Sequence, residues 1–92
     1  MVEHPAVSQV APNDHAAQAV WHEQEAARLR TAAKDELAMA EGYRKNPQSV
    51  HEIGGGMHKM NLIQHCEAIA GMYTKAAEEA EEIAKNHRDM LK

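Results

Sequence analysis

The chain has 92 residues, a formal net charge of -4 at pH 7, 43% hydrophobic residues, one Trp, two Tyr and no Phe. This length indicates one small domain, and the negative charge argues against nucleic-acid binding, which needs a basic surface. No apolar run approaches the ~20 residues that span a bilayer, and the first residues lack the basic and apolar regions of a signal peptide. The expected location is therefore either the cytosol or, for a mature form whose signal was replaced by Met1, the periplasm.

Residues 1–13 contain two prolines and no periodicity, which predicts a flexible N-terminal arm. Asn13 or Asp14 is a suitable N-cap. A helix is predicted over about 14–46, because this segment is rich in Ala, Glu, Gln, Arg, Lys and Leu. It is expected to stop before Pro47, since the residue that precedes a proline is disfavoured in the α region.

A turn is predicted over about 47–56, where Gly54-Gly55-Gly56 follows a segment that could hold a short helical turn. A second helix is predicted over about 57–91. The fold class is therefore all-α, an antiparallel two-helix hairpin over residues 14–92. We expect two copies to form a four-helix bundle.

Heptad spacing predicts the packed seam of each helix. In the second helix the seam is Leu62, Cys66, Ile69, Tyr73, Ala76, Ala80, Ile83, His87 and Met90. In the first helix it is less regular: His22, Ala26, Leu29, Ala33, Leu37, Ala40 and Tyr43.

Self-association is expected because small scaffolds generally need a disulfide, a metal or a partner for stability. Cys66 is the only cysteine, so a disulfide within the chain is excluded. The predicted seam also leaves an apolar flank of Ile63, Met72 and Ala77 on the second helix, which a homodimer would cover.

Seven histidines and six methionines are an unusual content for a chain of this length. If the turn centres near residue 54, positions whose numbers add to about 109 lie opposite each other, and His22 then lies beside His87. Glu25 and Met90 would lie within one turn of them. Imidazole and thioether ligands suit copper, and imidazole suits zinc or haem iron. The alternative is a polar layer that fixes the register of the helices without any ligand.

His58, His65 and Met72 follow one another at seven-residue spacing on the second helix, about 10.5 Å per step, which is too far for two of them to share one ion. They are expected to be surface side chains. No histidine has a glutamate three residues before it, as di-iron bundles require. The C-x-x-C-H motif of covalent haem attachment is also absent.

The second helix contains His65-Cys66, then Tyr73-x-x-Ala76-Ala77-x-Glu79, then Ala84-x-x-His87-x-x-Met90. This pattern, over residues 65–92, resembles a group of small, exported, uncharacterised bacterial helical-hairpin proteins. The resemblance implies a bacterial origin and a periplasmic location, but no activity.

The expected function is therefore that of a non-enzymatic, self-associating helical-bundle protein that acts by self-association or partner binding. The alternative is a carrier of copper, zinc or haem that uses His22 and His87, with Glu25 and Met90.

Overall fold

The computed structural model describes residues 4–45 and 55–92, with side chains of the second helix from His58 onward. These residues form one turn of 3-10 helix, Val7–Gln9, and two long helices, α1 (His15–Lys45) and α2 (Gly55–Asp89). The described residues include no strand. Neither helix, over its described residues, has an apolar stretch long enough to cross a membrane.

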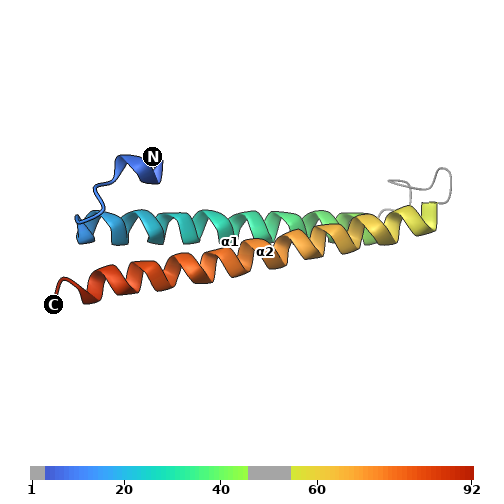
Figure 1. Ribbon diagram of the computed structural model, residues 1–92. Coiled ribbons are helices and arrows are strands. Elements are labelled where there is room, and N and C mark those ends of the chain that lie inside the picture. Colours follow the sequence, from blue (N-terminus) through green and yellow to red (C-terminus); the bar gives the residue numbers. More distant parts are fainter. Residues whose placement is uncertain (1–3, 46–54) are drawn as a thin grey trace.

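The two helices run antiparallel and pack against each other along their length, as Figure 1 shows. The molecule is a rod with principal extents of 57 × 23 × 19 Å. The prediction of an all-α hairpin is confirmed. Both termini lie near the same end of this rod, where α1 begins and α2 ends (Figure 1). We call this the open end.

Asp14 caps the start of α1, because its Oδ1 accepts a hydrogen bond of 3.0 Å from the backbone N–H of Ala17. A side-chain acceptor at this position satisfies one of the amide groups that have no partner in the first turn. The expected end of α1 at Asn46-Pro47 and the turn through residue 54 lie outside the described residues. Helix α2 begins at Gly55, slightly before the expected start near Met57.

The interface between the helices is made chiefly of alanine. Its buried apolar residues are Ala19, Ala26, Leu29, Ala33, Ala40, Ile63, Cys66, Ala70, Ala77, Ala80 and Ala84. Tyr73 and Tyr43 are half-buried against the two clusters that these residues form. No large side chain among the described residues is fully buried. The small side chains let the helices approach closely, but each contributes little buried area.

The structure corrects the predicted seam of α2. Cys66, Tyr73, Ala80 and His87 lie at the interface as predicted. The remaining predicted positions are half-buried or exposed, namely Leu62, Ile69, Ala76, Ile83 and Met90. The interface instead buries the next residue along the chain after the first four of them: Ile63, Ala70, Ala77 and Ala84. Both sets are apolar at heptad spacing. The buried residue is the smaller one at Ile69/Ala70 and Ile83/Ala84, whereas the other two pairs do not differ in size. The expected exposure of Ile63 and Ala77 is wrong.

The predicted seam of α1 is correct except at one position. Leu37 is exposed, and the half-buried Glu36 takes the inward position beside it. The Glu36 carboxylate lies near Cys66, where burial raises the pKa of the thiol and this carboxylate raises it further. A thiol that is buried and protonated is a poor nucleophile, which supports the interpretation of Cys66 as a small core residue.

Ion pairs join the two helices along one flank of the interface. Arg88 binds Glu23 through two hydrogen bonds of 2.8 and 2.7 Å, and Arg30 binds Glu81 through two of 2.9 and 2.8 Å. Arg44 binds Glu67 on the same flank. These exposed pairs contribute modestly to stability, but their bidentate geometry specifies the register. We call this side of the hairpin the ion-pair flank.

Candidate functional site

Three histidines meet at the open end of the hairpin. His15 and His22 lie on the first turns of α1, and His87 lies on the last turns of α2. The Nδ1 atoms of His15 and His87 are 3.0 Å apart, and the stacked rings of His22 and His87 have centroids 6.2 Å apart. All three side chains are half-buried. We call this group the histidine cluster.

Hydrogen bonds constrain the protonation of these rings. The Nδ1 of His22 lies 2.8 Å from the backbone oxygen of Gln18, which can only accept, so this nitrogen carries a proton. In the neutral ring the lone pair is therefore on Nε2. Between His15 and His87, one Nδ1 must donate and the other must accept, so the accepting Nδ1 carries no proton and its lone pair takes part in this hydrogen bond.

The structure brings together two of the four residues predicted as metal ligands. His22 and His87 are neighbours, as the predicted register requires. Glu25 instead binds Arg28 and His4, at 2.7 and 2.9 Å. Met90 is 59% exposed and lies on the outer side of α2. Across the described parts of the chain, no group of three or more His, Cys, Asp or Glu side chains is arranged to hold a metal ion.

His15 is the member of the cluster that was not predicted as a site residue. It precedes His22 by seven positions, which places it on the same face of α1 one heptad nearer the open end. That spacing was visible in the sequence. The predicted register, however, paired His87 with a single histidine and gave no reason to extend the site beyond it.

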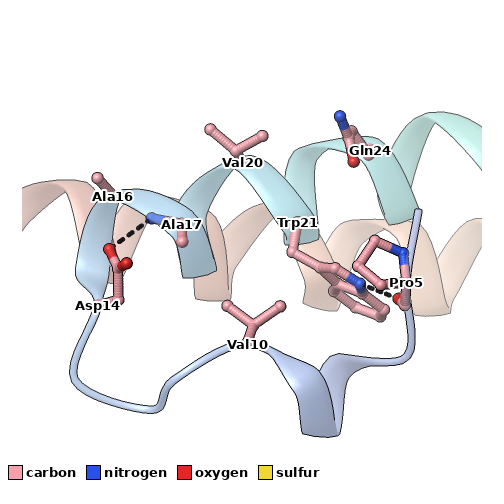
Figure 2. Close-up of a pocket in the computed structure, with 8 residues that line it drawn as sticks. All are labelled: Pro5, Val10, Asp14, Ala16, Ala17, Val20, Trp21 and Gln24. Carbon is pink, nitrogen blue, oxygen red and sulfur yellow. Dashed lines mark hydrogen bonds between the residues drawn. The ribbon is translucent and has the colours of Figure 1, made fainter. Parts of the chain in front are cut away.

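The N-terminal arm packs onto the outer side of α1. The ring of His4 stacks on Trp21 with centroids 4.4 Å apart, and the Trp21 Nε1–H donates a 2.6 Å hydrogen bond to the backbone oxygen of Pro5. Gln18 donates to the backbone oxygens of Val10 and Ala11, each at 3.2 Å. Figure 2 shows the shallow hollow of about 500 Å³ between the arm and α1, with Trp21 and Val10 at its sides.

Glu25 is the electrostatic anchor of this arm. Hydrogen bonds from Arg28 are the main reason that its pKa falls to about 2, the contact with His4 lowers it further, and burial opposes both. A carboxylate with a lowered pKa stabilises the folded state above its ordinary pKa near 4.5, and this contribution is lost as the pH falls towards 2. We therefore expect the arm to detach over that range of pH.

Replacing Glu25 with Gln should loosen the arm at neutral pH, because the variant keeps the shape but loses the charge that holds His4 and Arg28. Trp21 is the only tryptophan, so its fluorescence reports the change directly, as a shift of emission to longer wavelength. Glu41→Gln is the matched control, since among the described residues Glu41 pairs with the helix neighbours Arg44 and Lys45 and not with the arm. An unchanged Trp21 spectrum in Glu25→Gln would contradict this role.

A line of apolar side chains follows α2 on its outer surface. It consists of Leu62, Ile69, Ala76, Ile83 and Met90, each seven residues from the next. Ile69 is 38% exposed and Ile83 is 39% exposed, which is unusual for isoleucine. We call this line the apolar stripe. Its members are about 10.5 Å apart along the axis, since each step is seven residues.

The apolar stripe and the ion-pair flank lie on nearly opposite sides of α2. Successive residues of an α-helix are 100° apart, so Glu81, five residues after Ala76, is rotated about 140° from it. On α1 the same rule places Met39, which is also exposed, on the side away from Arg44. The hairpin therefore has one side on which charged side chains pair with each other. On the opposite side the apolar stripe and Met39 are exposed, and the arm covers the first turns of α1.

No protein-family model matches the chain, and comparisons with curated proteins and with solved structures find no match either.

Proposed function

We propose that this protein works by self-association, as a homodimer in which two hairpins form a four-helix bundle through their apolar sides. The observation that carries the proposal is the apolar stripe, because Ile69 and Ile83 keep 38% and 39% of their surface exposed on a molecule that fully buries no large side chain in its described residues. Complete burial of an exposed side chain of this kind contributes roughly 1.5–3 kcal/mol, and a dimer would gain the part of this that corresponds to the surface still exposed. A second copy would supply the core that one hairpin lacks.

The order of residues along the apolar stripe suits a two-fold interface. Leucine, isoleucine, alanine, isoleucine and methionine follow at equal spacing, so the stripe reads nearly the same in both directions from Ala76. A two-fold axis at Ala76, perpendicular to the helices, would place Ala76 against its copy. It would also place Ile69 against Ile83 of the second copy. In such an interface each contact occurs twice, which is what a symmetric dimer requires.

The other surfaces of the hairpin are less suited to this contact. The ion-pair flank already uses its charges between α1 and α2. On the apolar side of α1, Gln18 and Glu25 are held by the arm, which covers the first turns of the helix. The open part of the apolar side is thus α2 and the far half of α1, where Met39 lies. We therefore place α2 against α2 at the centre of the dimer.

Light scattering on the purified protein tests this proposal. The mass in solution is expected to be twice the 10.2 kDa of the chain at micromolar concentration and above. A mass of 10.2 kDa that persists at hundreds of micromolar would overturn the proposal.

A further inference from the structure

We propose that His15 and His87 form a binding site for one divalent transition-metal ion of the group that prefers imidazole, such as Zn²⁺ or Cu²⁺. The site lies within one hairpin, between the first turn of α1 and the last turn of α2. It does not depend on the proposed dimer. It also differs from the site predicted from the sequence, since His15 replaces His22 as the partner of His87, and Glu25 and Met90 are not ligands.

The separation of the two rings is the first argument. Two imidazole nitrogens that bind one zinc ion at about 2.0–2.1 Å each lie roughly 3 Å apart. The Nδ1 atoms of His15 and His87 are 3.0 Å apart, so the helices already hold them at this spacing. Small rotations of the two rings would direct both lone pairs at one ion. The helices need not move.

The protonation of the pair is the second argument. The contact between His15 and His87 holds one proton between two nitrogens, and a metal ion would take the place of that proton. The donating ring then carries its proton on Nε2 instead of Nδ1, so both rings stay neutral and bind the ion through Nδ1. Imidazole is a preferred ligand of copper, zinc and nickel, whereas calcium and magnesium take oxygen ligands. The ligand type thus determines the class of ion.

The surroundings favour an ion over haem. The side chains next to the cluster in the seam are small and buried, with Ala19 at 0% and Ala84 at 3% exposure. Such close packing leaves no width for a porphyrin. Two protein ligands leave coordination positions for water, and His22 provides a third imidazole nearby, 6.2 Å from His87 between ring centroids. The ion would join the two chain segments at the open end and so stabilise the hairpin.

Calorimetric titration of the untagged protein with Zn²⁺, and separately with Cu²⁺, tests the site. We expect one ion per chain, and at least a tenfold loss of affinity in His15→Ala and in His87→Ala. Nitrogen hyperfine coupling in the electron paramagnetic resonance spectrum of the Cu²⁺ form should show two imidazole ligands. The control is His65→Ala, which removes an exposed histidine of α2 and should bind as the wild type does.

Circular dichroism shows whether each variant is folded. A melting temperature that rises with Zn²⁺ in the wild type, but not in the His15→Ala/His87→Ala variant, would support the site. Wild-type protein that binds neither ion would overturn it, and the histidines would then form a polar layer that only fixes register. Equal affinity in the wild type and in folded His15→Ala would also overturn it. Neither of these results depends on whether the protein is a monomer or a dimer. The metal site and the proposed dimer can therefore be disproved independently.

Discussion

Replacing Ile69 and Ile83 together with glutamate is expected to convert the protein from a dimer to a monomer. In the proposed bundle each isoleucine faces the other one in the second copy, so the two substitutions change four buried side chains. Because the isoleucines expose only 38% and 39% of their surface in the hairpin, each change removes a fraction of the roughly 1.5–3 kcal/mol that complete burial contributes, and it adds the cost of removing a carboxylate from water. The dissociation constant should rise by a factor of more than about a thousand, since every 1.4 kcal/mol is tenfold. Sedimentation equilibrium measures this directly.

Leu37→Glu is the matched control for this experiment. Leu37 is 49% exposed, more than either isoleucine, and it lies on α1 away from the apolar stripe. The same kind of substitution there should leave the dimer intact. If Ile69→Glu/Ile83→Glu and Leu37→Glu associate equally, the apolar stripe is not the interface.

Replacing Ala77 with leucine should destabilise the protein, because Ala77 has 0% exposure between the helices. A larger side chain at such a position would force the helices apart or twist neighbouring side chains from their rotamers, at a cost of about 1–3 kcal/mol. For a domain of this size, each kcal/mol lowers the melting temperature by roughly 4–8 °C. Thermal unfolding followed by circular dichroism measures the change.

Ala27→Leu is the corresponding control on α1, where the alanine is exposed and the added side chain meets solvent. Its melting temperature should stay close to that of the wild type. An Ala77→Leu variant as stable as Ala27→Leu would mean that Ala77 does not lie in a closely packed seam, contrary to the structure.

The sequence predicted the helices and their register well, because local signals determine both. The sequence offered Asn13 or Asp14 as the cap, and the structure has Asp14. The proximity of His22 to His87 followed from the position of the turn. The hairpin geometry leaves little freedom once the turn is placed. Cys66 was likewise predicted as a small buried residue, and it is one.

The choice between two apolar lines on α2 was not determined by the sequence. Ile69 and Ile83 are larger than Ala70 and Ala84, and a rule based on hydrophobic size places the larger pair inside. Leu62 and Ile63 do not differ in size, so that rule cannot choose between them. The actual seam also depends on how closely two backbones approach, and on ion pairs such as Arg30–Glu81 between residues 51 positions apart. The distance between the backbones and the ion pairs depend on both helices together, so the pattern of one helix does not predict them.

The candidate site was only partly predictable for a similar reason. His4 stacks on Trp21 and binds Glu25, so the arm contacts residues of α1 some twenty positions later in the chain. No periodic pattern in the sequence predicts contacts of this kind. Glu25 was therefore predicted to be a metal ligand beside the histidines at the open end, whereas its carboxylate pairs with Arg28 and with the arm.

Disulfide cross-linking at Ala76 tests the central claim most directly. In a Cys66→Ala background, Ala76→Cys is expected to form a covalent dimer rapidly under mild oxidation, because the proposed two-fold axis brings position 76 against its copy. Thr74→Cys, at nearly the same height but on the opposite side of α2, should cross-link only slowly. Rapid cross-linking at position 74 with none at position 76 would contradict the proposed dimer.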